Sequence, residues 1–538
     1  MSSHKDRSHL TPAWVSSRRD VLKSGGALAL VSLALPFARR SLVRGQNADY
    51  AFDYFIGPNG SDSNPGTLQQ PWAITAINTK HSVYGGLGKK IGIIAGTYNV
   101  QALAASRGSG PGGYGIWVLD VDGGSAASGP TVVASCDSNG NYQRGGAVIT
   151  QKVGSTYGNP NNNNSSATAR AGNPTIGQSP QAPHRGYVTL DGLTLTGNIS
   201  GGVQFNQVSR STMYGVTVKN CEFFDNNGVG SEDGDNLCCL SIAVCEAALI
   251  QNNYFHDCVG YSPGSLNHLS AVLQWQSNHV VYEFNTAVNC GGLYGKEAPQ
   301  NGNTVRYNYV DISMFSSGDT AFSALSDFAE GNNSDQIDIY GNVFIGMHPL
   351  TALPNLGGGS TAPINIYNNT CIISPNAGGA DYYGIGTAIS TAKALRIYNN
   401  IVYNNSGDRM MEGYVLLNLA SVALIDFNLY CHGGGSDVWT SWTSQQSGGV
   451  GYSSLSAWQA ATGGERNSIA ATAAPLFIGT GTFADLYKLQ PGSPAVGSGR
   501  STGVSTGAAC DMGAWGNGAI RVGHDFGALP QPPTLTVS

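Results

Sequence analysis

The chain has 538 residues, 74 of them Gly, and only 11% of its residues are charged. Most chains of this length divide into two or three domains, whereas a Gly-rich, charge-poor composition suits many tight turns between short buried strands. The formal net charge of −6 disfavours binding to nucleic acid or to an anionic membrane. We expect neither as a partner.

The N-terminus resembles an export signal. A Ser-Arg-Arg-Asp-Val-Leu-Lys phrase at 17–23 precedes an apolar run over 25–38. The phrase is similar to the twin-arginine signal, with Val21 where Phe is usual. The run is too short to span a membrane, so we expect residues 1–45 to be removed and the folded protein to be periplasmic or secreted. The remaining chain holds 19 Lys and Arg against 31 Asp and Glu, a net charge of −12.

A short phrase ending in Asn recurs through the middle of the chain. Its last residues are Cys221, Asn253, Asn285, Asn308, Asn342, Asn369, Asn400 and Asn428, separated by 32, 32, 23, 34, 27, 31 and 28 residues. A period of this size with variable insertions is typical of a solenoid. Apolar residues three and five positions before the Asn, with Asn303 as the exception, indicate strands with one buried face.

These features predict an all-β fold, a right-handed parallel β-helix with three short strands in each coil. Asn favours corners because its side chain bonds nearby backbone and tolerates unusual dihedral angles, and stacked Asn corners would form a ladder. Each coil contacts only its neighbours, so we expect one monomeric domain over 50–520, capped by 432–520 and followed by a tail over 521–538. The Asn-, Ser-, Pro- and Gly-rich segment 153–186 is predicted to be a long surface loop.

The ten cysteines form no C-x-x-C motif and give no metal signature. Cys258 and Cys290 each lie five residues after a ladder Asn, so we expect them on adjacent rungs. Adjacent strands are about 4.8 Å apart, which is within the range that a disulfide needs. Two stacked, buried thiols would fit the same spacing.

Phrases on both sides of the repeat carry a resemblance to a known superfamily. They are Tyr-Phe-Ile-Gly at 54–57 with Gly-Ser-Asp-Ser-Asn-Pro-Gly-Thr at 60–67, Ile-Gly-Ile-Ile-Ala-Gly-Thr-Tyr at 91–98, Leu-Gln-Pro-Gly-Ser-Pro-Ala at 489–495 and Asp-Met-Gly-Ala at 511–514. They are similar to the opening and closing phrases of secreted bacterial β-helix proteins of the pectate-lyase-like superfamily. Many members are polysaccharide lyases that act on uronate polymers, so the resemblance implies an acidic polysaccharide as the partner.

A lyase needs a base for the weakly acidic C5 proton and positive charge near the developing anion. Between Lys219 and Lys393 the chain has 16 carboxylates but only two Lys or Arg, Lys296 and Arg306. The Cys-Gly-Gly-Leu-Tyr-Gly-Lys-Glu phrase at 290–297 resembles the Lys-bearing coil of family 9 pectate lyases and, more loosely, that of the chondroitinase B and alginate lyase family. The resemblance implies Lys296 as the base, with glycines that admit a sugar and Tyr294 beside it as a substrate contact.

Desolvation would help Lys296 to lose its proton, whereas the neighbouring Glu297 would favour the charged form. A solvated Lys in a turn is the simpler interpretation of this residue. For calcium, the best candidates are Glu232, Asp233 and Asp235, because hard cations bind several oxygens from a bent loop. Family 9 lyases carry a similar Asp-Asp-Gly phrase, although here Glu232 takes the first position. A solvated acidic turn is the alternative.

Arg306 stands two residues before its ladder Asn, so it should point outward with Glu283 one coil earlier. It is a candidate catalytic cation or, more simply, half of an ion pair between rungs. Tyr340, Tyr367 and Tyr398 continue the same outward column in the coils that follow. Tyr340 and Tyr367 are candidate substrate contacts, since tyrosines can stack on sugars or on each other.

A hydrolase would need two carboxylates that face a cleft. The stretch with Asp319, Asp327, Glu330 and Asp335 is where we expect them, and counting from the ladder places Glu330 in the slot of Lys296 one coil on. Three functions therefore remain open from the sequence. They are a polysaccharide lyase, a glycoside hydrolase or epimerase, and a carbohydrate-binding or structural solenoid without chemistry.

Overall fold

The structure is a computed structural model. The residues that it describes are 50–107, 117–154, 175–179, 182–198, 202–205, 211–226, 238–258, 270–297, 299–313, 323–326, 335–346, 348–351, 362–374, 384–386, 395–404, 410–411, 422–432, 437–441, 450–452, 454–471, 474–481, 483–501, 510–515 and 522–525.

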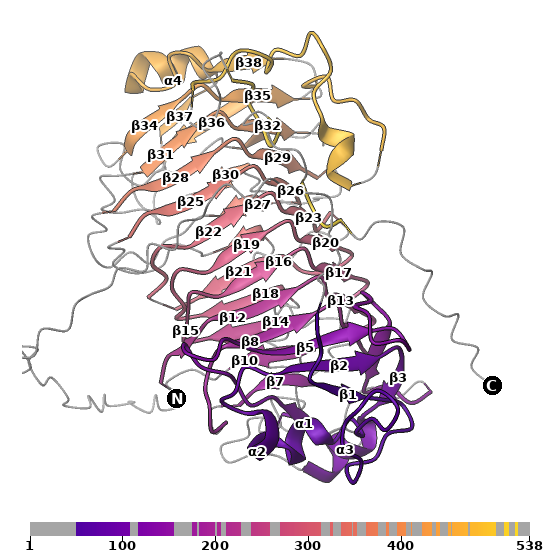
Figure 1. Ribbon diagram of the computed structural model, residues 1–538. Helices are drawn as coiled ribbons and strands as arrows, with labels where there is room; N and C mark the ends of the chain where they lie inside the picture. The colour runs from indigo at the N-terminus through magenta and orange to yellow at the C-terminus, as the bar shows by residue number, and fades with distance from the viewer. Residues whose placement is uncertain are drawn as a thin grey trace, which may run out of the picture. The chain divides into compact units, whose positions relative to one another are not determined.

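The chain folds as a right-handed parallel β-helix, as the Asn repeat predicts, and its three sheets are all parallel. Each coil passes from sheet 1 to sheet 2 and then to sheet 3, and equivalent strands of successive coils pair side by side (Figure 1). Each coil pairs with the coil before it and the coil after it, so the solenoid is one continuous succession of coils.

Sheet 1 has nine strands: β4 (Leu119–Asp120), β7 (Ile176–Gln178), β10 (Val203–Phe205), β14 (Cys238–Ala243), β18 (Ser270–Trp275), β21 (Leu293–Lys296), β24 (Ser323–Ser326), β27 (His348–Thr351) and β30 (Ile385–Gly386).

Sheet 2 has twelve strands: β1 (Tyr54–Ile56), β2 (Lys90–Ile94), β5 (Thr131–Cys136), β8 (Val188–Asp191), β12 (Val216–Lys219), β16 (Leu249–Gln251), β19 (Val281–Glu283), β22 (Thr304–Arg306), β25 (Ile337–Tyr340), β28 (Ile364–Tyr367), β31 (Leu395–Tyr398) and β34 (Val422–Asp426).

Sheet 3 also has twelve strands: β3 (Gly96–Asn99), β6 (Ala147–Thr150), β9 (Thr194–Thr196), β13 (Glu222–Phe224), β17 (Tyr254–His256), β20 (Thr286–Val288), β23 (Tyr309–Asp311), β26 (Val343–Gly346), β29 (Thr370–Ile373), β32 (Ile401–Asn404), β35 (Leu429–His432) and β38 (Ile469–Ala471).

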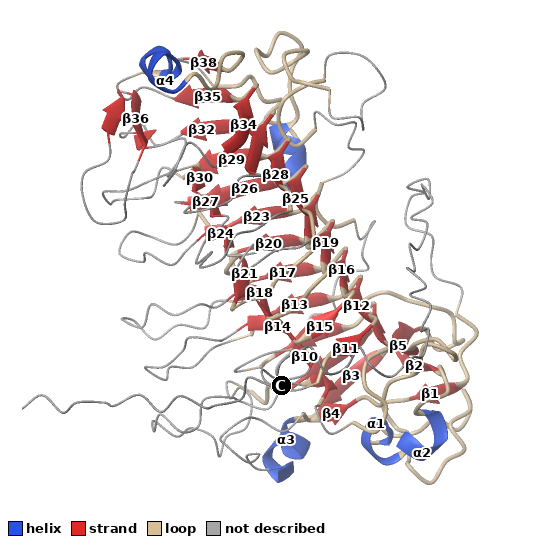
Figure 2. Ribbon diagram, turned by 90° about the vertical axis from the view of Figure 1, so that its left-hand side faces the viewer, coloured by secondary structure: helices blue, strands red, loops and turns tan. Residues whose placement is uncertain are grey.

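Short elements lie outside the three sheets. Two small sheets contain β11 (Met213–Tyr214) with β15 (Cys245–Glu246), and β33 (Met410–Met411) with β36 (Asp437–Ser441) and β37 (Val450–Tyr452). Helices α1 (Ala76–Thr79), α2 (His81–Tyr84) and α3 (Gln101–Arg107) lie near the first coils, and α4 (Leu455–Thr462) near the last (Figure 2). A 3₁₀ helix spans Phe483–Tyr487. Within the described residues, no helix is long and apolar enough to cross a membrane.

The predicted Asn ladder is present at the corner between sheets 2 and 3. Asn342 is fully buried, and its carbonyl oxygen accepts hydrogen bonds from the backbone and side-chain nitrogens of Asn308 at 2.9 and 3.0 Å. Its amide donates to Asn369 Oδ1 and to the carbonyls of Val305 and Tyr340 at 2.9–3.0 Å. The same pattern joins successive ladder residues from Asn253 to Asn428. Each ladder Asn between these two thus accepts hydrogen bonds from the Asn of the coil before it and donates to the Asn of the coil after it.

The left-handed backbone of each corner lies one residue before the ladder Asn, which corrects the expectation that Asn itself adopts it. Positive φ occurs at Asn252 (55°), Phe284 (57°), Tyr307 (57°), Asn368 (52°) and Phe427 (58°). This conformation is costly for bulky residues. The ladder bonds on the following residue hold the backbone there.

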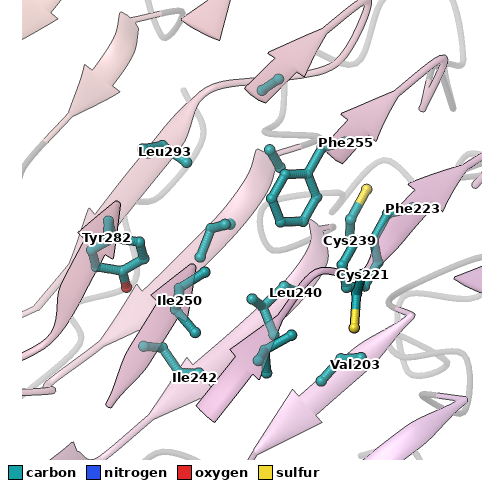
Figure 3. Close-up of a cluster of buried hydrophobic side chains, with 14 of the residues drawn as sticks. Val203, Cys221, Phe223, Cys239, Leu240, Ile242, Ile250, Phe255, Tyr282 and Leu293 are labelled. Atoms are coloured by element: carbon teal, nitrogen blue, oxygen red, sulfur yellow. The ribbon is translucent and has the colours of Figure 1, made fainter. Parts of the chain in front are cut away.

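The interior is filled by the apolar positions that the alternation predicted. Ile250, Tyr282, Val305, Ile339 and Ile366 are fully buried, and Phe223 and Phe255 stack at 4.7 Å between ring centroids (Figure 3). Asn303, the exception, also points inward and accepts a hydrogen bond from the Val280 amide at 3.0 Å. A polar side chain is tolerated there because it serves the backbone of the preceding coil.

Two segments differ from their predicted form. The range 153–186 contains strand β7, which pairs with β4 and β10 inside sheet 1, so it is not wholly a loop. Three residues with Gly177 at the centre are too few to show periodicity. Of the predicted tail over 521–538, the structure describes 522–525, and these residues pack on the solenoid. His524 stacks on Tyr254 at 4.2 Å between ring centroids, and the Asp525 amide donates to Asn252 Oδ1 at 2.7 Å.

Candidate functional site

The candidate site lies on the outer face of sheet 1, where β18 and β21 pair in parallel. Trp275 is in register with Lys296, and Leu273 with Tyr294. Between them, Gln274 points into the core, where its carbonyl oxygen accepts the Tyr282 hydroxyl at 2.7 Å. Because side chains alternate along a strand, Trp275, Tyr294 and Lys296 all face outward. The structure therefore brings the predicted base and one predicted substrate contact onto one face.

Lys296 and Trp275 interact directly. The Lys296 ammonium lies over the Trp275 indole, 4.7 Å from the ring centroid, and both side chains are partly buried. A cation over an aromatic face is attracted by the negative charge density of the ring. The pair combines positive charge and an aromatic surface at one point of the sheet, a combination that suits an anionic sugar ring.

The corner after Lys296 carries a carboxylate. Glu297 is exposed and has a left-handed backbone, with φ of 60°. Its carboxylate accepts a hydrogen bond from the Gln276 amide at 3.0 Å, and its backbone carbonyl accepts one from Gln300 at 3.1 Å. These bonds fix the turn that presents Lys296.

One of the glycines near Lys296, Gly292, serves the packing of the coils. A Cβ atom on Gly292 would lie 2.3 Å from the Ser323 carbonyl oxygen and 2.5 Å from that of Ala324, so glycine is required where the next coil passes. Gly295 is buried and in register with the inward-facing Gln274.

Arg306 lies on β22 in sheet 2, whereas Lys296 lies on β21 in sheet 1. Its guanidinium forms an ion pair with Glu283, with a hydrogen bond of 2.7 Å from Nε, and donates to the Tyr340 hydroxyl at 3.0 Å. Burial acts to lower the pKa of Arg306, but the charge of Glu283 and the contact with Tyr340 outweigh burial and raise it. The ion pair between rungs, which was the simpler of the two interpretations, is present.

The tyrosines of the same column stack on each other. Tyr340 and Tyr367 have ring centroids 4.8 Å apart with an interplanar angle of 9°, and Tyr367 and Tyr398 are 5.1 Å apart at 3°. Tyr367 is only 8% exposed, and both faces of its ring are covered. The geometry thus matches self-stacking, and the ring of Tyr367 is not open to a sugar.

A cluster of which the sequence analysis named only Asp335 lies at the corner between sheets 1 and 2. His279 bonds Glu246 through Nδ1 and lies 3.2 Å from Asp335 through Nε2. The hydrogen bond from His279 to the Glu246 carboxylate raises the pKa of His279 against the opposing effect of partial burial. The spacing of 33 residues between Glu246 and His279, one more than the 32-residue coil, was a usable signal.

Several predicted site residues lie outside the described residues. They are the calcium candidates Glu232, Asp233 and Asp235 and the carboxylates Asp319, Asp327 and Glu330.

The sequence analysis missed Trp275 because the corners differ in length. Seven residues separate the strands after Lys296, against five after Trp275. Counting from the ladder therefore does not align the two.

Comparison with known proteins adds two structural neighbours. No protein-family model and no curated protein matches the chain. Among solved structures, the chain is similar to a rhamnogalacturonan lyase at 12% identity and a TM-score of 0.26, covering 74% of this chain and 78% of that one. It is also similar to PfbA, a surface adhesin of Streptococcus pneumoniae, at 10% identity and a TM-score of 0.32, covering 68% and 84%.

Proposed function

We propose that the protein is an exported carbohydrate-active β-helix protein, a lyase that cleaves a uronate-containing polysaccharide by β-elimination. The observation that carries the proposal is the Lys296 ammonium over the Trp275 ring on the outer face of sheet 1. Tyr294 lies on β21, the strand of Lys296, and faces the same side. The scarcity of other Lys and Arg residues in the middle coils, together with the ion pair that holds Arg306, leaves Lys296 as the candidate base.

The binding step follows from the chemistry of the two side chains. A pyranose ring presents C–H groups that pack on an indole face, and a uronate carboxylate is attracted by an ammonium. A sugar that stacks on Trp275 would take the place of the Lys296 ammonium over the ring. Lys296 would then be next to the sugar, within reach of its ring hydrogens.

In the proposed reaction, the Lys296 ammonium first gives a proton to solvent, and the resulting amine accepts the C5 proton of the uronate. The C–H electron pair forms a double bond between C4 and C5, and the bond from C4 to the glycosidic oxygen breaks. That oxygen leaves with the bonding pair and takes a proton from solvent. A positioned base typically contributes about 100- to 10,000-fold to such a step.

A bound Ca²⁺ near Glu232, Asp233 and Asp235 stays part of the proposal as a cofactor. Those carboxylates would hold the ion through oxygen, and it would supply positive charge to a uronate carboxylate. The steps above depend only on the side chains of sheet 1. Loss of activity in a chelator, restored by Ca²⁺, is the expected result.

The test is incubation of the purified protein with a panel of uronate polymers. Ultraviolet absorbance of the unsaturated product reports elimination, and a reducing-end assay reports any cleavage. We expect both signals with at least one polymer, and a loss of roughly 100- to 10,000-fold in Lys296→Ala. Reducing ends without unsaturation would instead indicate a hydrolase that uses carboxylates, and binding without cleavage a carbohydrate-binding solenoid.

A further inference from the structure

Three thiols meet inside the solenoid, on the side away from the Asn ladder. The sulfur atoms of Cys239, Cys258 and Cys290 all lie within 4.8 Å of one another, and all three residues are fully buried. None of the ten cysteines is in a disulfide. Cys258 and Cys290 are therefore stacked on adjacent rungs as predicted, in the thiol form, with Cys239 as a third member that the spacing did not indicate.

The fold explains why the three converge. Cys239 lies on β14, which begins a coil in sheet 1, and Cys258 follows β17, which ends the same coil in sheet 3. Cys290 follows β20 one coil later, and the Cys258 amide donates to the Asn289 carbonyl at 3.1 Å. The thiols thus join the start of one coil to the ends of two. Figure 3 shows Cys239 with Phe223 and Phe255 in this part of the interior.

A buried amide is directed at the sulfurs. Asn226 is 4% exposed, and its Nδ2 lies 3.8 Å from the Cys239 sulfur and 3.7 Å from that of Cys258. Its Oδ1 accepts hydrogen bonds from the backbone and side chain of Asn198 at 3.2 and 2.8 Å, which fixes the orientation of the amide. N–H groups that point at sulfur stabilise the thiolate form.

The other buried cysteines near this region have ordinary surroundings. The Cys221 sulfur donates to the Lys219 carbonyl at 3.3 Å, and the Cys245 sulfur to the Ala243 carbonyl at 3.4 Å. Cys258 also has such a contact, with the His256 carbonyl at 3.2 Å. Cys258 differs from them because two more thiols, those of Cys239 and Cys290, lie beside it. In the part of the chain that the structure describes, no other group of His, Cys, Asp or Glu brings three ligand atoms so close.

We propose that Cys239, Cys258 and Cys290 bind one thiophilic d¹⁰ cation, Zn²⁺ or Cu⁺, as three thiolates. Metal–sulfur bonds of about 2.3 Å place the sulfurs of such a site about 3.8–4.0 Å apart, a small contraction from the observed arrangement. Thiolate ligands select soft cations over Ca²⁺ and Mg²⁺, which bind oxygen. Binding releases the thiol protons and transfers no electrons. The ion would link two coils from inside.

The experiment measures metal content in the full-length protein, produced with Zn²⁺ or with copper in the growth medium and analysed by native mass spectrometry and elemental analysis. We expect about one ion per chain in the wild type, and the two media tell which cation is held. The variant is Cys290→Ser. The matched control is Cys245→Ser, another buried thiol that lies outside the cluster.

Loss of the ion in Cys290→Ser with retention in Cys245→Ser supports the site. Equal metal content in the wild type and Cys290→Ser overturns it. If Cys290→Ser does not fold, the mass of the wild type decides alone. A metal adduct that has lost thiol protons supports the site, whereas an unmodified mass, or peptides that join two of the three cysteines by a disulfide, contradicts it.

Discussion

Two outer faces of the same solenoid differ in how their few cationic side chains are placed. On sheet 2, Arg306 is bound to Glu283 and Tyr340, and the column continues into tyrosines that cover each other. On sheet 1, Lys296 rests on Trp275, because β18 places the indole in register with it. The first face uses its charge to hold coils together. The second presents charge and an aromatic ring to the outside.

The structural role of sheet 2 is tested most strongly by Glu283→Ala. The change leaves the mostly buried Arg306 guanidinium without its carboxylate and removes the acceptor of the Gln251 amide. Breaking a buried pair costs about 3–5 kcal/mol, and because Arg306 is partly exposed we expect ~2–4 kcal/mol from urea unfolding. The matched control is Glu297→Ala, whose exposed carboxylate should contribute under about 1 kcal/mol. Equal losses in both would remove the contrast between the faces.

The ladder corner is tested by Asn342→Ala. The change removes the hydrogen bonds to both neighbouring rungs and leaves the Asn308 backbone amide without its Asn342 acceptor. We expect a loss of roughly 1–3 kcal/mol in the free energy of unfolding, with activity at permissive temperature unchanged. An unfolding midpoint equal to that of the wild type would contradict the role of the ladder.

Sheet 1 should respond to Trp275→Ala in binding rather than in stability. Loss of the indole removes the surface on which a sugar would stack, and we expect polysaccharide affinity to fall about 3- to 10-fold, on the order of 1 kcal/mol. Tyr214→Ala removes another exposed aromatic, on β11, and should leave affinity unchanged. Calorimetric titration with the active polymer measures both. An unchanged affinity in Trp275→Ala would place the binding surface elsewhere.

The smallest effect concerns the corner between the two faces. The hydrogen bond to Glu246 raises the pKa of His279 above 6.5, so protonated His279 stabilises the fold fully below that pH, and the stabilisation is lost as pH rises through the raised pKa. The group is exposed, so we expect under about 1 kcal/mol. Unfolding curves below and above this window should differ less in His279→Gln than in the wild type. An identical pH dependence would show that the pair contributes nothing.

The sequence predicts the fold well because the ladder is local and periodic. An Asn three residues after a buried apolar residue marks the corner between sheets 2 and 3 in each coil from Asn253 to Asn428, and the outward column from Glu283 to Tyr398 could be placed by counting from it. The candidate site could be predicted only in part. Lys296 stands out by charge, but its partner Trp275 depends on corners of different length, which counting does not resolve. The thiol cluster includes Cys239, which lies at the start of the coil that ends with Cys258. The fold brings these two ends together, and the spacing of the Asn repeat does not indicate it.

The most direct test of the account measures turnover and unfolding free energy together in Lys296→Ala and Arg306→Ala, with the polymer found active. The account predicts that Lys296→Ala loses roughly 100- to 10,000-fold in turnover and keeps the wild-type stability. Arg306→Ala should lose stability, because Glu283 is left buried without a counter-charge, and keep its turnover where it is folded. Full activity in Lys296→Ala, or a loss of turnover in folded Arg306→Ala as large as in Lys296→Ala, would contradict the division of roles between the two faces.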